Sequence, residues 1–186
     1  MASPLLNIPN ILTMLRVALI PVLVALAYLP YDWRFLVSAL VFLLAAITDW
    51  FDGYLARRLN QSTAFGRFLD PVADKLMVAA ALVILVQWHH DRVLVVISAI
   101  IIVSREITIS ALREWMAELG KRASVAVSFM GKLKTTMQMT AITVLLLNNE
   151  ALNMYLGFPL LIVAAALTLW SMVIYLRAAW PHLRDS

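Results

Sequence analysis

Apolar stretches near the length of a bilayer crossing recur along this chain, and they constrain its fold more than any other feature. Residues 35–47, FLVSALVFLLAAI, form the middle of one such stretch. A soluble domain of 186 residues has too little interior to bury a composition that is 63% hydrophobic and 14% charged. The chain is therefore predicted to be an integral membrane protein. Helices are the expected spanning element, because lipid cannot satisfy open backbone groups.

The apolar stretches predict six transmembrane helices, separated by turn residues such as Pro30, Gly120 and Asn148. The expected spans are residues 8–29, 33–59, 71–89, 92–118, 124–147 and 152–179. The first span lacks a basic leader, so we expect it to remain as a helix of the mature protein. The polar segments are short, so residues 1–186 are expected to form a single all-α membrane domain.

Basic residues are distributed unevenly between the two ends of these spans. With six spans, both termini share one side of the membrane with the second-to-third and fourth-to-fifth connections. All but two of the 15 Lys and Arg residues, Arg34 and Arg92, fall in that half, which predicts cytoplasmic termini. The net charge of +4 then marks a face that attracts anionic membrane lipids. Nucleic acid is not expected as a partner, because the basic residues are not interleaved with exposed aromatic ones.

Four aspartates are concentrated between residues 49 and 74. Asp49 and Asp52 are spaced i, i+3 in the second span, and Asp70 and Asp74 are spaced i, i+4 at the start of the third. Each pair therefore lies on one helical face. Since a short connection joins the two helices, we expect antiparallel neighbours whose charged ends meet near the cytoplasmic surface.

Each aspartate also has a purely structural interpretation. Asp70 precedes Pro71, which suits the first position of a helix, so Asp70 could be an N-cap. The other aspartates could pair with nearby basic side chains, which are Arg57, Arg58 and Lys75. Four converging carboxylates nevertheless repel one another, and ionisable groups at membrane depth are costly and usually functional. We therefore favour a metal site, with Mg²⁺ or Mn²⁺ suited to ligands that are all oxygen.

Small residues accompany the aspartates. Gly53, Ala56 and Arg57 continue the helical stripe of the first aspartate pair, and Gly66 precedes the second pair. A glycine inside a helix costs about 1 kcal/mol relative to alanine, so Gly53 is expected to provide a groove for a ligand or for another helix. Close packing between helices is the alternative. Because Arg57 can meet a phosphate or a structural carboxylate, the stripe indicates a phosphorylated ligand bound through metal.

The spacing of these residues resembles a family signature. The run Asp49-x2-Asp52-Gly53-x2-Ala56-Arg57-x8-Gly66-x3-Asp70-x3-Asp74 matches that of the CDP-alcohol phosphatidyltransferases without a departure. Eight positions at fixed spacings make the match specific. The resemblance extends to NIPNILTMLR near the start and to residues 104–139, and it covers essentially the whole chain.

The resemblance implies six transmembrane helices, usually in a homodimer, with a site that faces the cytoplasm in the cytoplasmic (inner) membrane of a bacterium. It implies that two Mg²⁺ or Mn²⁺ ions are held by Asp49, Asp52, Asp70 and Asp74, with Asp74 as the general base. The residues that it implies for the CDP-lipid pocket are Asn10, Thr13, Arg16, Gly53, Ala56, Arg57 and Gly66.

The resemblance also implies the substrates. Its full-length extent favours members that transfer the phosphatidyl group of CDP-diacylglycerol to sn-glycerol 3-phosphate, giving phosphatidylglycerophosphate and CMP. The same chemistry with inositol phosphate, serine or phosphatidylglycerol as acceptor stays open, since the signature reports only the CDP-lipid. A divalent-cation transporter is the weaker alternative, because the carboxylates gather at one end of the helices and no charged relay continues to the other.

A phosphorylated acceptor requires cations besides the metal ions. Arg105 and Arg113 in the fourth span and Lys132 and Lys134 in the fifth are the candidates. Arg113 and Lys134 are the preferred pair. Arg105 could instead pair with Glu106 or with an aspartate of the site, and Lys132 could extend to the membrane interface.

Overall fold

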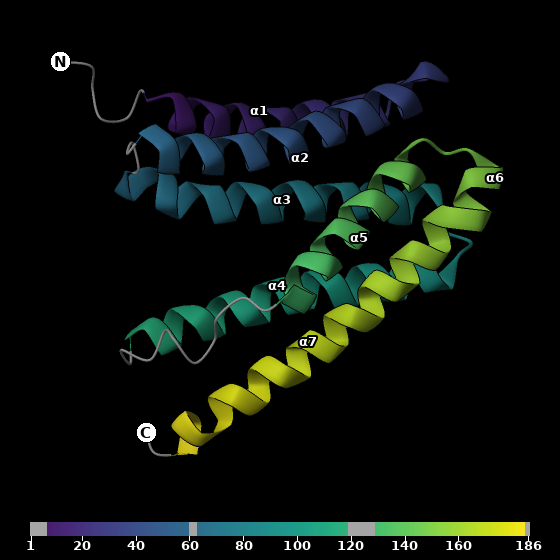
Figure 1. The fold of residues 1–186 in the computed structure, drawn as a ribbon. Coiled ribbons are helices and arrows are strands. Elements are labelled where there is room, and N and C mark those ends of the chain that lie inside the picture. The colour runs from purple at the N-terminus through teal and green to yellow at the C-terminus, as the bar shows by residue number, and fades with distance from the viewer. Residues whose placement is uncertain (1–6, 60–62, 119–128, 185–186) are drawn as a thin grey trace.

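The computed structural model describes residues 7–59, 63–118 and 129–184, without the side chains of residues 8, 9, 50, 52–59, 64, 67, 129–132 and 181–184. These described residues form an all-helical fold (Figure 1). Its elements are α1 (Ile8–Ala27), α2 (Trp33–Leu59), α3 (Ala64–Trp88), α4 (Val93–Glu118), α5 (Phe129–Leu146), α6 (Glu150–Leu152), the π-helical turn η2 (Asn153–Gly157) and α7 (Phe158–Arg184).

Three segments within the described ranges are long and apolar enough to cross a membrane. They are Asn10–Ala27, Val93–Glu118 and Glu150–Trp180. Large apolar side chains such as Val83 and Ile107 are mostly exposed, at 68% and 65%, and a surface of this kind suits contact with lipid. The predicted all-helical membrane protein with several spans is thus confirmed, whereas the full set of six spans stays a prediction.

Helix α3 begins earlier than the sequence predicts. Thr63 is its N-cap, with an extended backbone and a hydroxyl oxygen that accepts a hydrogen bond from the Gly66 N–H at 3.0 Å. The helix then continues through Pro71, which lacks only the N–H that would bond the carbonyl four residues earlier. The interpretation of Asp70 as an N-cap is therefore wrong, because Thr63 supplies the cap and Asp70 lies inside the helix.

The connection to the C-terminal span follows the predicted turn signal. Asn148 has a φ of 50°, in the left-handed region that asparagine tolerates better than most residues. The Asn149 side chain then caps α6 by accepting a hydrogen bond from the Leu152 N–H at 3.0 Å. The helical segment therefore begins at Glu150, two residues before the predicted start. The predicted start of the fifth span, residue 124, lies outside the described residues.

The helices form two groups (Figure 1), and a single main core of buried side chains connects them. In the first group α1 packs against both α2 and α3, and in the second α4 and α5 pack against α7. Contacts of α5 with α2 and α3, and of α3 with α4, join the groups. The main core includes Phe42, Leu82, Ile102, Leu145 and Leu161. A smaller set, called here the α4–α7 cluster, consists of Ile109, Leu112, Met116, Tyr175 and Ala179.

Candidate active site

One face of α1 carries three polar side chains that are almost fully buried. Asn10, Thr13 and Arg16 follow one another at intervals of three residues and are exposed by 1% or less. A buried polar or charged group destabilises the fold unless it finds a partner. Each of the three reaches a polar atom on another part of the chain, so α1 organises the site that the aspartates form.

Arg16 and Thr13 each bind one of the signature aspartates. Arg16 Nη1 forms an ion pair with Asp49 Oδ1 of α2 at 2.7 Å, and 45% of the Asp49 side chain stays exposed. Thr13 Oγ1 donates a hydrogen bond to Asp70 Oδ1 of α3 at 2.5 Å. In this way α1 fixes carboxylates from two different helices relative to each other.

Asn10 connects α1 to the start of α3. Its Oδ1 accepts a hydrogen bond from Thr63 Oγ1 at 3.0 Å. A Cβ placed on Gly66 would lie only 2.6 Å from the same Asn10 oxygen. A side chain at position 66 would have to displace the Asn10 amide, so the glycine allows α1 to approach the start of α3 closely.

Asp74 lines a cavity of about 640 Å³ among α3, α4, α5 and α7. Asp74 lies one helical turn after Asp70 on α3, so the cavity adjoins an aspartate that α1 holds. The charged residues of the lining are three acids and four bases: Asp74, Glu106, Glu114, Lys75, Arg105, Arg113 and Lys134. The cavity therefore combines a carboxylate that can accept a proton with a lining whose net charge is positive.

Glu106 of α4 holds two of the predicted phosphate-binding cations. Its Oε1 accepts hydrogen bonds from Lys134 Nζ of α5 and, at 3.3 Å, from Arg105 Nη1. Lys134 and Arg105 are 2% and 7% exposed, so their charges need a nearby counter-charge. The sequence left two possible partners for Arg105, which were Glu106 and an aspartate of the site. In the structure Arg105 pairs with Glu106.

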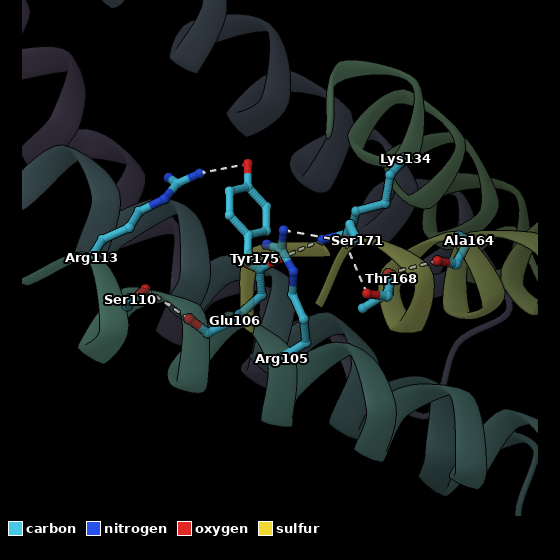
Figure 2. A network of polar contacts seen from close by, with 9 residues as sticks. All are labelled: Arg105, Glu106, Ser110, Arg113, Lys134, Ala164, Thr168, Ser171 and Tyr175. Carbon is cyan, nitrogen blue, oxygen red and sulfur yellow. Dashed lines mark hydrogen bonds and ion pairs between the residues drawn. The ribbon is translucent and has the colours of Figure 1, made fainter. Parts of the chain in front are cut away.

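Helix α7 contributes polar partners to the arginines of the cavity, and its Tyr175 also lines the cavity itself (Figure 2). Ser171 Oγ accepts a hydrogen bond from Arg105 Nη2 at 3.3 Å, and Tyr175 Oη accepts one from Arg113 Nη2 at 3.1 Å. Ser171 and Tyr175 are four residues apart and so lie on one face of α7. The sequence analysis missed both residues, and their spacing of four on a mostly apolar helix was the signal that could have found them.

The described carboxylates have the chemistry of a metal site but do not complete one by themselves. Asp49, Asp70 and Asp74 offer only oxygen atoms, which suit Mg²⁺ or Mn²⁺. Among the described side chains no three acidic or histidine groups are close enough together to hold an ion. The fourth aspartate of the signature, Asp52, is outside the described side chains.

Several predicted site residues cannot be placed in this geometry. The side chains of Asp52, Gly53, Ala56, Arg57 and Lys132 all lie outside the described set, although these positions belong to α2 and α5. The predicted residues that the structure does bring together fall into two neighbouring sets. One set is Asn10, Thr13, Arg16, Asp49, Gly66 and Asp70, and the other is Asp74, Arg105, Arg113 and Lys134.

Comparison with known proteins identifies the family of this chain. The chain belongs to the CDP-alcohol phosphatidyltransferase family, whose model matches residues 6–173.

Relatives of this chain are similar over nearly their whole length. The CDP-diacylglycerol–glycerol-3-phosphate 3-phosphatidyltransferase of Salmonella choleraesuis (strain SC-B67) is 59% identical over 179 residues, which cover 96% of this chain and 98% of the relative. The protein of the same name from Pseudomonas fluorescens is 56% identical over 181 residues, covering 96% and 92%.

A solved structure shares the fold at lower identity. The apo crystal structure of Mycobacterium tuberculosis phosphatidylinositol phosphate synthase superposes with a TM-score of 0.67. The match covers 95% of this chain and 90% of that one at 20% identity, so it supports the fold alone.

Proposed function

We propose that this protein transfers the phosphatidyl group of CDP-diacylglycerol to sn-glycerol 3-phosphate, giving phosphatidylglycerophosphate and CMP. The observation that carries the proposal is the cavity that brings Asp74 together with Arg105, Arg113 and Lys134. Relatives that are 56–59% identical over nearly the full chain bear the name of this activity, which supports glycerol 3-phosphate as the acceptor.

The four signature carboxylates are the proposed ligands of a pair of divalent cations. Asp49 and Asp70 are each held through Oδ1, by Arg16 and Thr13, so both carboxylates are oriented by contacts outside the metal-binding set. In the proposal Asp49, Asp52, Asp70 and Asp74 hold two Mg²⁺ or Mn²⁺ ions. These aspartates would hold the ions, which when bound would supply positive charge to offset that of the diphosphate and of the leaving CMP.

Asp74 is the proposed general base. The C1 hydroxyl of glycerol 3-phosphate attacks the phosphorus that bears the diacylglycerol, and Asp74 accepts its proton. The new bond joins phosphorus to the glycerol oxygen, and the bond from phosphorus to the oxygen of CMP breaks. Because Asp74 lines the same cavity as the basic residues, an acceptor bound through its phosphate can present its hydroxyl to this carboxylate.

The basic lining is proposed to bind the phosphate of the acceptor. Arg113 and Lys134 contact it, Arg105 supports them, and Lys132 contributes from the start of α5. Arginine suits this role because its fixed fork of donors matches phosphate oxygens. Lys134 already has Glu106 as a counter-charge, so an arriving phosphate shares this cation with a carboxylate.

The CDP-lipid is proposed to lie on the aspartate side of the site. Gly53, Ala56 and Arg57 form its groove. The other residues proposed for this pocket shape the wall where α1 meets α2 and α3. They are Asn10, Thr13, Arg16 and Gly66. Their contacts with Thr63, Asp70 and Asp49 support a role in shaping that wall.

At the level of the cell, we propose a single domain with six spans in a bacterial cytoplasmic membrane, with both termini and the site on the cytoplasmic side. The distribution of basic residues along the sequence supports this orientation. A homodimer is the proposed assembly, in keeping with the family.

A comparison of acceptors tests the substrate. Purified protein in detergent–lipid micelles receives CDP-diacylglycerol and Mg²⁺, and CMP release is followed with glycerol 3-phosphate, inositol 1-phosphate, serine or phosphatidylglycerol. We expect CMP release with glycerol 3-phosphate, loss of the activity on chelation with EDTA, and its return when Mg²⁺ or Mn²⁺ is added. Faster release with another acceptor would overturn the proposed substrate, and turnover in EDTA would overturn the metal site.

A further inference from the structure

Tyr175 is fixed in place on α7 by apolar packing. It is 6% exposed and belongs to the α4–α7 cluster, where its neighbours include Ile109, Leu112 and Met116. The same residue lines the cavity that contains Asp74. An aromatic ring held by packing on one side, with a polar tip on the other, is a rigid support for groups that contact it.

Two guanidinium groups contact this one side chain. The Cζ atoms of Arg105 and Arg113 lie 5.4 Å and 5.3 Å from the centroid of the Tyr175 ring, within the range of cation–π attraction. Arg113 also donates a hydrogen bond from Nη2 to Tyr175 Oη at 3.1 Å. Figure 2 shows the tyrosine side chain between the two arginines.

The two arginines differ in their other partners. Arg105 is bound to Glu106 and Ser171, whereas Arg113 has no carboxylate partner among the side chains that the structure describes. Two guanidiniums near each other also repel. The negative face of the Tyr175 ring attracts both and offsets part of that repulsion, while its hydroxyl group orients Arg113 without neutralising it. An oriented guanidinium that keeps its full charge is suited to bind an oxyanion.

We infer that Tyr175 is a positioning residue, which holds Arg105 and Arg113 so that both face a phosphate in the cavity. The identity of that phosphate, as part of glycerol 3-phosphate, rests on the proposed function. The positioning itself rests on the contacts of Tyr175. Inorganic phosphate is therefore the probe that separates the two statements.

The test compares phosphate binding by the wild type and by Tyr175→Phe, measured by calorimetry on the purified full chain in micelles. The substitution keeps the ring in its cluster and removes only the hydroxyl group. We expect binding of inorganic phosphate to weaken about tenfold, as for a lost charge-assisted hydrogen bond. Tyr155→Phe is the matched control, because Tyr155 is 83% exposed on η2, and it should bind phosphate as the wild type does.

A second pair of variants tests whether Tyr175 acts through Arg113. In an Arg113→Gln background, Tyr175→Phe should weaken phosphate binding by less than about twofold, because the group that it orients is gone. An equal loss in both backgrounds would overturn the inference. Unchanged binding by Tyr175→Phe, or no measurable binding by the wild type, would also overturn it.

Turnover separates this inference from the proposed function. If the wild type is active, Tyr175→Phe should raise the KM for glycerol 3-phosphate by the same factor as it raises the Kd for phosphate. The KM for CDP-diacylglycerol should not change. A wild type that binds phosphate but releases no CMP with glycerol 3-phosphate would overturn the proposed acceptor. The phosphate titration would then still decide the role of Tyr175.

Discussion

Arg16 binds a signature aspartate from a fully buried position. It is 1% exposed, and its guanidinium forms an ion pair with an Asp49 carboxylate that is 45% exposed. Nearly half of the aspartate side chain stays exposed while the arginine that orients it is inside the helix bundle. The position of Asp49 therefore depends on a residue that is 33 positions away in the sequence.

Replacing this arginine should cost stability. Arg16→Gln removes the cation beside Asp49 and leaves a polar group at a buried position, so we expect a loss of about 1–3 kcal/mol. Because the Asp49 side chain is 45% exposed, the expected loss of stability is smaller than for a fully buried ion pair. Unfolding in mixed micelles titrated with SDS measures the change.

Arg92→Gln is the matched control for this substitution. Arg92 pairs with Asp91 at 3.4 Å, and the two side chains are 46% and 66% exposed. An exposed pair of this kind contributes about 0.5 kcal/mol or less. Equal losses from the two substitutions would contradict a special role for Arg16 in the fold.

Glu106 joins two helices at the cavity. It lies on α4, and its carboxylate holds Arg105 of the same helix and Lys134 of α5. Both cations are almost completely buried. This carboxylate therefore links α4 to α5, two helices that otherwise pack against α7, and it orients the Lys134 ammonium group.

Replacing Glu106 with glutamine keeps the shape of the side chain but removes its charge, and this should weaken the link between α4 and α5. Glu106→Gln removes the carboxylate that binds both Arg105 and Lys134 directly, and we expect a loss of about 1–3 kcal/mol in the free energy of unfolding. Glu114→Gln changes the same kind of residue in the same helix, at an exposed position of the cavity lining, and should stay within about 0.5 kcal/mol. The two variants are compared by SDS titration, and similar stability losses would show that the Glu106 contacts do not hold α4 and α5 together.

The sequence predicts the helices better than the contacts between them. The starts of α2 and α4 come within a residue of prediction, because apolar runs flanked by turn residues mark them. The start of α3 was wrong because Pro71 suggested a helix start, whereas the cap is Thr63. At the site, the signature spacing identifies the aspartates. It cannot show that Arg113 meets Tyr175, 62 positions away, because only the packing of α4 on α7 brings them together.

The whole molecule is expected to have its site and its two termini on one side of the membrane. The chain has no cysteine, so single cysteines can report the orientation without background labelling. In intact cells a membrane-impermeant maleimide should label His90→Cys, in the connection between α3 and α4, and should spare Ser186→Cys. Permeabilised cells, in which both positions should react, are the control. Labelling of Ser186→Cys alone in intact cells would reverse the orientation, and labelling of both would contradict the three spans predicted between these two positions.

The proposed chemistry as a whole depends on Asp74, which lines the cavity beside the basic residues and adjoins an aspartate that α1 holds. The most direct test measures the rate of CMP release from CDP-diacylglycerol and glycerol 3-phosphate by purified wild type, Asp74→Asn and the control Asp91→Asn. Loss of a general base should lower kcat for Asp74→Asn by about 100-fold or more. Asp91, 66% exposed beyond the far end of α3, should be replaceable without effect. An Asp74→Asn variant that keeps wild-type turnover would contradict the assignment of this cavity as the active site.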